Sequence, residues 1–315
     1  MSPLGQIVLR APATSANLGP GFDVFGLALE QPNDKVTLSL CASGIKIKVR
    51  GLQAETISTV PERNTAGVVA RYMIKEFSLK TGLTISIEKG ICPSRGLGSS
   101  AASAAAVAFG LNLMFDLNLS REQLIGLAAK GEIASAGTEH ADNVSATICG
   151  EFVILKSYNP IEVVNLKAPA DLAVCAGYAH MVTPRHKTEK ARSLLPKEIS
   201  MEKLVRNVGN AAAMVSGFAT GDVDLIGKSM LDAVVEPARA SFIPGYKQVK
   251  DKALEAGACG ITISGAGPAM LAVVNKKKAN PERVALAMKE GFREAGFQAT
   301  SFATRAGKGV SLMEK

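Results

Sequence analysis

Residues 93–102 read Pro-Ser-Arg-Gly-Leu-Gly-Ser-Ser-Ala-Ala and connect a strand-like pattern to an Ala-rich helical pattern that begins near Ser99. A glycine-containing loop that enters a helix directly leaves backbone N–H groups unpaired at the helix start, where the helix dipole is positive. Such a helix start binds anions, phosphate in particular. Gly96 and Gly98 allow the backbone to approach phosphate oxygens, and the hydroxyls of Ser99 and Ser100 suit phosphate or Mg²⁺. The segment therefore predicts a phosphate site, although a loop with a serine N-cap before a core helix has a similar composition.

Two common nucleotide-binding motifs do not match this loop. The phosphate loop of the GxxxxGK[ST] type carries a lysine after its last glycine, and here Ser99 follows Gly98. The dinucleotide-binding fingerprint needs a third glycine and an acidic residue at the end of a second strand, and the segment lacks both. We therefore expect a phosphate-binding loop of another kind.

Two further glycine-rich segments flank this loop in the sequence. The first, residues 11–23 (APATSANLGPGFD), follows an amino-terminal strand pattern, and its prolines and glycines fix a tight loop bearing Thr14, Ser15, Asn17 and Asp23. Polar side chains on a rigid loop at a strand end are typical of a substrate site. The second, residues 260–269 (GITISGAGPA), is a strand that enters a glycine-rich turn. Each segment alone is compatible with an ordinary turn, but chance does not explain all three in one chain.

The composition excludes several classes of protein. The 315 residues are 47% hydrophobic and 20% charged, which excludes a mainly disordered chain. The net charge is 36 − 28 = +8, but the basic residues are scattered, and without Trp and with four Tyr there is no stacking surface for nucleic acid. A modest positive field suits an anionic small molecule.

The cysteine pattern and the apolar segments indicate the compartment. The five cysteines are isolated, which argues against a structural zinc site or a disulfide framework and favours a reducing compartment. The amino terminus lacks the pattern of a signal peptide, and the apolar stretch at residues 101–115 is too short to cross a bilayer. We expect a cytoplasmic, globular protein with no membrane partner.

The order of the elements predicts an α+β fold in two domains. Strand patterns occupy residues 6–10, 35–40, 45–49, 83–88, 144–148, 152–155, 171–177, 260–264, 270–274 and 297–303. Helical patterns occupy residues 65–79, 99–115, 120–136, 201–219, 222–235, 246–256 and 281–295, with Asn64 as an N-cap and a capping box from Ser120 to Gln123. The proline-punctuated stretch at residues 159–169 marks a domain boundary. Helices packed on mostly antiparallel sheets account for this mixture.

The three motifs, in this order, resemble those of the GHMP kinases (galactokinase, homoserine kinase, mevalonate kinase and phosphomevalonate kinase). The similarity extends from about Ile7 to about Thr304, and within the family it is greatest to the homoserine kinase branch, on residues 11–23, 93–103, 140–144 (HADNV), 188–196 (TEKARSLLP) and 264–269. Two departures are Ser94, where a glycine is commoner, and Val144-Ser-Ala in place of VAP. The resemblance implies an amino-terminal ATP-loop domain at residues 1–160 and a ferredoxin-like carboxy-terminal domain at residues 161–315.

The resemblance also implies ATP and Mg²⁺ as cofactors. The loop that wraps the triphosphate comprises Pro93, Ser94, Arg95, Gly96, Leu97, Gly98, Ser99, Ser100, Ala101 and Ala102. Asn64 matches an asparagine that faces the adenine, and Ser100 with Glu132 matches the residues that handle Mg²⁺. A hydroxyl and a carboxylate suit a hard octahedral cation. Without the family, Glu132 reads as a surface acid on a helix.

The substrate side of the resemblance implies a zwitterion with a reacting hydroxyl. Arg192 and Arg239 match two arginines that clamp a carboxylate, for which a planar, permanently charged fork is well suited. Asp23 matches the partner of the ammonium, and the remaining polar wall comprises Asn17, Thr188, His140 and Asn143. From the residues alone, Arg239 is also compatible with an interdomain ion pair to Glu236, and His140 is more typical of a polar loop histidine than of a catalytic one.

The resemblance leaves the catalytic group open between Asp142 and Asn143, with His140 beside them. Mevalonate-type relatives use an aspartate of this loop as a general base. If Asn143 faces the hydroxyl instead, catalysis rests on in-line positioning and charge neutralisation, which phosphoryl transfer permits. We favour positioning by Asn143.

The expected activity is ATP-dependent phosphorylation of the side-chain hydroxyl of L-homoserine, a step of threonine biosynthesis. Two alternatives are a mevalonate- or shikimate-directed kinase of the same family and a non-catalytic, metabolite-binding member. The resemblance is also compatible with a homodimer.

Overall fold

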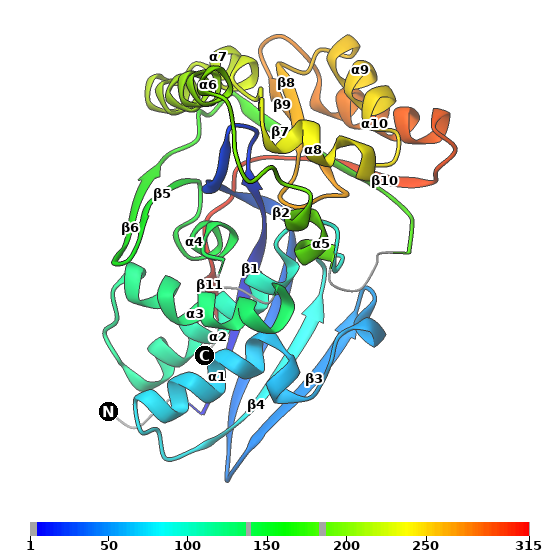
Figure 1. Cartoon of the computed structure of the whole chain (residues 1–315). Coiled ribbons are helices and arrows are strands. Elements are labelled where there is room, and N and C mark those ends of the chain that lie inside the picture. Colours follow the sequence, from blue (N-terminus) through cyan, green and yellow to red (C-terminus); the bar gives the residue numbers. More distant parts are fainter. Residues whose placement is uncertain (1–4, 137–139, 183–186, 315) are drawn as a thin grey trace.

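The computed structural model describes residues 5–136, 140–182 and 187–314, which form two sheets with helices packed against them (Figure 1). The first sheet has seven strands, in the order β11-β1-β2-β4-β3, with β5 paired to β2 and to β6. Its pairs are antiparallel except for the parallel pair of β3 with β4. The strands are β1 (Gln6–Asn17), β2 (Gly21–Cys41), β3 (Ile45–Gly51), β4 (Gly82–Lys89), β5 (Phe152–Tyr158), β6 (Ile161–Leu166) and β11 (Ser311–Glu314).

The second sheet is antiparallel and has the order β10-β7-β9-β8. Its strands are β7 (Leu172–Ala179), β8 (Gly260–Ile263), β9 (Met270–Asn275) and β10 (Ala299–Thr304). Helices α9 (Tyr246–Glu255) and α10 (Pro281–Glu294) bury Val249, Met288 and Phe292 in a core that they share with this sheet. The expected α+β class with mostly antiparallel sheets is confirmed.

The Ala-rich helix α2 (Ser99–Phe115) is central among the helices that pack with the first sheet (Figure 1). Its small side chains let it contact α1 (Thr65–Glu76), α3 (Arg121–Ala136), α4 (Asp142–Cys149), β1 and β2 at once. At Gly110 an added Cβ would lie 2.4 Å from a methyl carbon of Leu38. The remaining helices are α5 (Lys187–Ser193), α6 (Met201–Thr220), α7 (Val223–Lys228) and α8 (Val235–Arg239), with short 3₁₀ turns η1 (Ala54–Thr56), η2 (Pro61–Arg63) and η3 (Ala240–Phe242).

Three sequence predictions of secondary structure are wrong. The tight loop predicted at residues 11–23 is mostly strand, with Thr14, Ser15 and Asn17 in β1 and Asp23 in β2, because the two strands stay paired past the prolines through shifts of register. Residues 144–148 belong to helix α4 rather than to a strand, because this segment packs against β1, β2 and α2, and burial on nearly every face hides the helical period. The helix predicted at residues 222–235 ends at Lys228, and α8 begins only at Val235. Asp232 lies in the break, and its carboxylate accepts the N–H groups of Val234, Val235 and Glu236.

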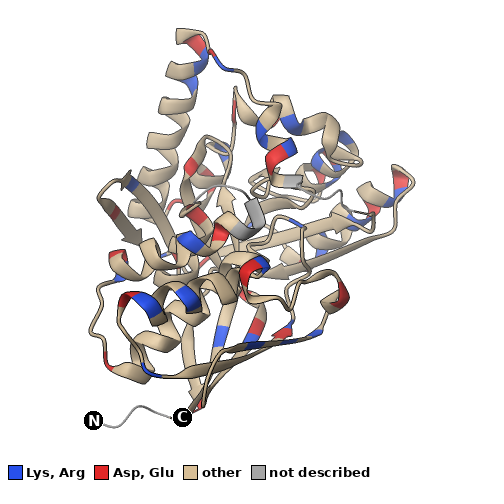
Figure 2. Ribbon diagram, turned by 60° about the horizontal axis from the view of Figure 1, so that its bottom comes forward, with Lys and Arg blue, Asp and Glu red and all other residues tan. Residues whose placement is uncertain are grey.

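Two elements of the second half of the chain belong to the first sheet. Strand β6 pairs with β5, and the carboxy-terminal strand β11 returns to pair with β1 (Figure 1). The division into residues 1–160 and 161–315 stays a prediction. Figure 2 shows Lys and Arg interspersed with Asp and Glu along the ribbon. None of the helices in the described part of the chain has the length and apolarity that a membrane crossing requires.

A buried ion pair between Lys89 and Asp34 joins the end of β4 to β2, and its lysine also contacts the start of α2. Lys89 Nζ donates to the Asp34 carboxylate, to the Ser99 carbonyl (2.9 Å) and to Ser103 Oγ (3.3 Å). The other carboxylate oxygen of Asp34 accepts the N–H groups of Gly90 and Ile91, both at 3.0 Å. Burial raises the pKa of Asp34 and lowers that of Lys89, while their mutual attraction opposes both shifts. The pair fixes both ends of the loop that carries the glycines.

We predict that Asp34→Ala lowers the free energy of unfolding by about 3–5 kcal/mol, because it leaves the Lys89 ammonium buried without its counter-ion. The matched control is Glu88→Ala, at the residue next to Lys89. It breaks the exposed Arg50–Glu88 pair and should change the free energy of unfolding by less than about 1 kcal/mol. Urea unfolding of both variants measures the difference. Equal losses would show that the buried pair adds nothing beyond a surface contact.

Candidate active site

One cavity of about 660 Å³ collects most of the predicted site residues. It is bordered by the loop after β4, the start of α2, the end of β1 and the start of β2, the start of α4, and α5, α8 and the turn after β8. The lining includes these predicted residues: Asn17, Asp23, Asn64, Pro93, Ser94, Gly96, Gly98, Ser99, Ser100, Glu132, His140, Asp142, Asn143, Thr188, Arg192 and Arg239. Residues from distant parts of the sequence thus line the same cavity.

Backbone hydrogen bonds join the three glycine-rich segments directly. Thr14 N donates to the Leu97 carbonyl (3.1 Å), which connects the first segment to the second. Ala269 N donates to the Arg95 carbonyl (2.9 Å), and Gly265 N donates to the Ala16 carbonyl (3.2 Å). The third segment therefore contacts both of the others, and the cavity lies where all three meet.

Gly96 and Gly98 are required at these contacts. Both have a positive φ, 86° and 65°, which L side chains rarely adopt. A Cβ at Gly96 would lie 2.4 Å from the Ser264 carbonyl oxygen, and one at Gly98 would lie 1.9 Å from Thr14 Oγ1. The glycines thus allow the close packing of the loops themselves, in addition to the approach to a ligand that the sequence suggested.

The start of α2 has the arrangement of an anion site. Gly98 is the N-cap, and no side chain caps the helix there. The first intrahelical hydrogen bond runs from Ala102 N to the Gly98 carbonyl (2.9 Å), so the N–H groups of Ser99, Ser100 and Ala101 precede it. Together with the helix dipole, these N–H groups attract negative charge.

Four residues of the predicted loop do not line the cavity. The side chains of Arg95, Leu97, Ala101 and Ala102 are buried behind it. The Arg95 guanidinium carbon lies 5.6 Å from the centre of the Tyr178 ring. Any part that these residues take in ligand binding would use their backbone, and their assignment to the nucleotide site stays a prediction.

Asn64 combines a structural role with a place on the cavity. As the sequence predicted, it caps α1, with its Oδ1 accepting from Ala66 N (3.0 Å) and Gly67 N (3.4 Å). Its Nδ2 donates to the Ser58 carbonyl (2.7 Å). These contacts fix the side chain, and the role facing adenine stays a prediction.

Ser100 and Glu132 lie together on the same wall as the start of α2. Ser100 Oγ donates to Glu132 Oε2 (3.0 Å), and Glu132 is only 7% exposed. The alternative interpretation of Glu132 as a solvated surface acid therefore does not fit. Among the described residues, no three His, Cys, Asp or Glu side chains surround a common metal position. A cation here would need most of its shell from a ligand and water.

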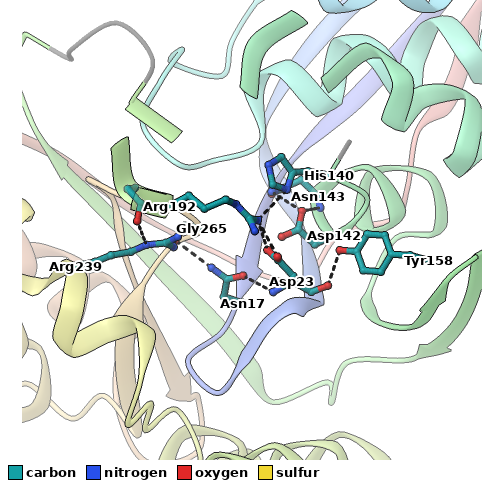
Figure 3. Close-up of polar contacts among 10 residues, drawn as sticks. Asn17, Asp23, His140, Asp142, Asn143, Tyr158, Arg192, Arg239 and Gly265 are labelled. Atoms are coloured by element: carbon teal, nitrogen blue, oxygen red, sulfur yellow. Dashed lines mark hydrogen bonds and ion pairs between the residues drawn. The ribbon is translucent and has the colours of Figure 1, made fainter. Parts of the chain in front are cut away.

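Opposite the glycine loop, Asp23 and Arg192 face each other (Figure 3). Arg192 Nη2 donates to both carboxylate oxygens of Asp23, at 3.0 and 2.8 Å, and lies 3.3 Å from His140 Nδ1. Burial and the charge of Arg192 lower the pKa of His140, so that its ring is neutral near pH 7. The structure thus places His140 in the polar wall that the resemblance implied.

Arg239 contacts the backbone of two other segments. Its Nε donates to the Ala191 carbonyl (3.2 Å), and its Nη1 donates to the Gly265 carbonyl (3.1 Å), which also accepts from Asn17 Nδ2 (Figure 3). Glu236, the alternative partner suggested by the sequence, instead accepts from Lys250 Nζ (2.8 Å), Tyr246 and Thr262. The Arg239 side chain therefore borders the cavity without a Glu236 ion pair.

Phe22 and Lys89 are among the lining residues of this cavity that the sequence did not indicate. The Phe22 ring lies 5.2 Å from the Arg192 guanidinium carbon and 5.3 Å from that of Arg239, within the range of cation–π contact. The position of Phe22 in GPGFD, directly before Asp23, could have indicated a place beside the substrate site. Lys89 also borders the cavity, but an isolated lysine at a strand end gave no sign of burial.

Asp142 and Asn143 form the remaining wall at the start of α4. Asn143 Oδ1 accepts from Thr14 Oγ1 (2.8 Å). Asp142 Oδ1 accepts from both the backbone N–H (2.7 Å) and the Nδ2 (3.3 Å) of Asn143. Burial and the nearby Asp23 carboxylate raise the pKa of Asp142 to about 6. Both candidates for the catalytic group thus lie on the cavity and contact each other.

Comparison with known proteins shows the family. The model of the GHMP kinases N terminal domain matches residues 64–151, and that of the GHMP kinases C terminal matches residues 214–294. The chain belongs to the GHMP kinase family, as the resemblance implied, and its two-domain fold is that of the family. A homoserine kinase of Methanococcus vannielii is 44% identical over 98% of this chain and 99% of its own length.

Further comparisons agree with this result. A homoserine kinase of Halorubrum lacusprofundi is 42% identical over 98% of this chain and all of its own length. The crystal structure of a homoserine kinase from Cytophaga hutchinsonii superposes with a TM-score of 0.91 at 34% identity, covering 99% of both chains. A galactokinase of Lactococcus lactis, at a TM-score of 0.69 and 17% identity, shares the fold.

Proposed function

We propose that this chain transfers the γ-phosphoryl group of ATP to the side-chain hydroxyl of L-homoserine, giving O-phospho-L-homoserine for threonine biosynthesis. One observation carries the proposal: a single cavity has an anion-binding helix start on one side and an acid with two arginines on the other. The first suits a triphosphate and the second an amino acid. The near-full-length similarity to homoserine kinases supports the same substrate.

The nucleotide would bind along the loop after β4. The N–H groups at the start of α2 and the hydroxyls of Ser99 and Ser100 would hold the phosphates, with Asn64 toward the base. Lys89 lies behind this loop and contacts the Ser99 carbonyl, so we assign it to shaping the phosphate site.

The donor set at Ser100 and Glu132 fits Mg²⁺, because a hydroxyl and a carboxylate are oxygen ligands that meet at 3.0 Å beside the phosphate site. We propose that these two residues hold the ion, which when bound neutralises charge on the transferred phosphoryl group. The assignment fails for either residue if Ser100→Ala or Glu132→Gln keeps wild-type turnover at limiting Mg²⁺.

The amino acid would occupy the opposite end of the cavity. Arg192 and Arg239 would bind its carboxylate and Asp23 its ammonium, with Asn17, Thr188 and His140 completing the polar wall. This arrangement directs the hydroxyl toward Asn143 and the glycine loop. The reacting groups would then meet in the centre of the cavity.

We propose that Asn143 positions the hydroxyl and that no side-chain base operates. Its carboxamide is held by Thr14 and Asp142, and an amide can orient a hydroxyl but cannot take its proton as a carboxylate can. In a loose transition state for phosphoryl transfer, a general base contributes little, and positioning and charge stabilisation dominate. Asp142 would support the amide, and its protonated form keeps a carbonyl oxygen that still accepts from Asn143.

This mechanism predicts contrasting variants. Asn143→Leu should lower turnover by about 10²–10⁴, as much as the loss of a general base does elsewhere, because the hydroxyl loses its orientation. Asp142→Asn should act through loop order alone and leave the shape of the pH–rate profile unchanged. The measurement is turnover against pH from 5 to 9.

The opposite result would assign the base to Asp142. With a pKa of about 6, this carboxyl would have to lose its proton before acting, so wild-type turnover would fall below about pH 6. Asp142→Asn would then remove that acidic limb, and Asn143→Leu would remain near the wild type.

A coupled ADP-release assay across several alcohols tests the activity. We expect turnover with L-homoserine to exceed that with mevalonate, shikimate and galactose, because only homoserine offers an ammonium to Asp23 together with a carboxylate to the arginines. Preference for mevalonate or shikimate would assign the chain to another member of the family. Absence of ADP release with every alcohol would favour a metabolite-binding protein.

We also propose a homodimer. Four side chains at helical spacing, Met201, Leu204, Val205 and Val208, are 71%, 39%, 65% and 58% exposed on the first turns of α6. An apolar stripe of this kind suits burial against a second copy. Analytical ultracentrifugation that returns the mass of one chain would exclude the dimer.

We further propose a cytoplasmic location and the two-domain division at residues 160 and 161. The five free cysteines support the first, since they suit a reducing compartment. Cell fractionation tests the location, and limited proteolysis near residue 160 tests the division.

A further inference from the structure

The two charged groups that would bind the ends of the substrate also bind each other. Arg192 Nη2 contacts both oxygens of the Asp23 carboxylate, at 3.0 and 2.8 Å (Figure 3). Both residues line the cavity, and their side chains are 39% and 27% exposed. A ligand that uses either group therefore has to compete with this ion pair.

The Asp23 backbone is held in place on both sides. Its N–H donates to Asn17 Oδ1 (3.1 Å), and its carbonyl accepts from Tyr158 Oη (2.7 Å). Its φ of 57° lies in the left-handed region, which Asp adopts more readily than most residues. These two hydrogen bonds fix the backbone that carries the carboxylate beside the cavity.

Asp142 also interacts electrostatically with Arg192, but without the two-oxygen contact that Asp23 makes. Phe22 presents a ring at 5.2 Å, and His140 presents Nδ1 at 3.3 Å with a lowered pKa that keeps its ring neutral near pH 7. Arg239, the second guanidinium nearby, adds positive charge and donates to two backbone carbonyls. Separation of Asp23 from Arg192 thus leaves two charges that a ligand has to satisfy.

We propose that the Asp23–Arg192 pair selects zwitterionic alcohols by ion-pair exchange, an inference that rests on the proposed function. A zwitterion brings an ammonium for Asp23 and a carboxylate for Arg192, so both charges are paired again after the exchange. A hydroxy acid without the amine leaves Asp23 without a hydrogen-bonded cation, and an amino alcohol without the carboxylate leaves Arg192 without a hydrogen-bonded anion; the charges of Arg239 and Asp142 act on them without such a contact. An unpaired, partly buried charge is costly, and the pair therefore excludes both singly charged analogues.

The exchange predicts that removal of one partner improves the binding of one analogue. In Asp23→Asn, Arg192 is free, so kcat/KM for 4-hydroxybutyrate, which is homoserine without its amino group, should rise by about tenfold or more. The value for L-homoserine should fall by about 30-fold or more, because its ammonium loses its partner. Arg192→Met should reverse the pattern and favour 3-aminopropan-1-ol, which lacks the carboxylate.

The experiment measures kcat/KM of the full-length chain for these three alcohols at saturating ATP. Asp116→Asn is the matched control, since it makes the same change of charge at the exposed end of α2. Calorimetric binding of 4-hydroxybutyrate to each variant is measured in parallel and needs no turnover. A rise in its affinity in Asp23→Asn, absent from Asp116→Asn, supports the exchange.

Two results keep this inference separate from the proposed function. If Asp23→Asn lowers kcat/KM for all three alcohols in the same proportion, and the affinity for 4-hydroxybutyrate does not rise, ion-pair exchange is wrong although homoserine remains the substrate. If the wild type gives no turnover with L-homoserine, the proposed function is wrong. The calorimetric comparison of Asp23→Asn with the wild type then still decides whether the pair excludes a single carboxylate.

Discussion

The whole site depends on the contact of one glycine-rich loop with the backbones of two others. Gly96 packs against the Ser264 carbonyl and Gly98 against Thr14, at distances that exclude even a methyl group. Backbone hydrogen bonds of 2.9 to 3.2 Å among these segments fix their relative positions. A cavity assembled in this way is rigid where the phosphates would bind, as in-line transfer requires.

The same contact brings the two sheets into one site. Gly96 and Gly98 lie between β4, a strand of the first sheet, and the helix α2 that packs with that sheet. Ser264 directly follows β8, a strand of the second sheet. Behind the loop, the buried Asp34–Lys89 pair holds its beginning and the first residues of α2. On the far side, Arg239 reaches the Gly265 carbonyl, so the substrate end of the cavity is built on the same turn as the nucleotide end.

Local signals in the sequence predicted much of this arrangement. The helix at residues 99–115 and the capping box of Ser120 and Gln123 are confirmed, because propensity and capping depend on neighbouring residues alone. The helix α4 could not be predicted in the same way, since much of its burial comes from β1, β2 and α2, which are distant in the sequence. Likewise, Lys89 and Phe22 acquire their roles only through partners far along the chain.

The alternative role of Arg239, an ion pair with Glu236, is excluded because other donors bind the Glu236 carboxylate. Glu236 is three residues from Arg239, which made an ion pair reasonable, but Lys250, Tyr246 and Thr262 occupy that carboxylate in the fold. Arg239 is thereby directed to the cavity. Closeness in the sequence therefore does not predict an ion pair where several donors converge on one carboxylate in the fold.

Nucleotide binding by Gly96→Ala tests the central claim most directly. Gly44→Ala is the control, because Gly44 also has a positive φ, 73°, but an added Cβ there has nothing within 4 Å. The control should cost only the backbone strain of about 1–2 kcal/mol in stability and bind ADP with wild-type affinity in calorimetric titration. Gly96→Ala should lose ADP binding by at least about tenfold while remaining folded by circular dichroism, because the loop has to move away from Ser264. Wild-type affinity for ADP in a folded Gly96→Ala chain would contradict the account.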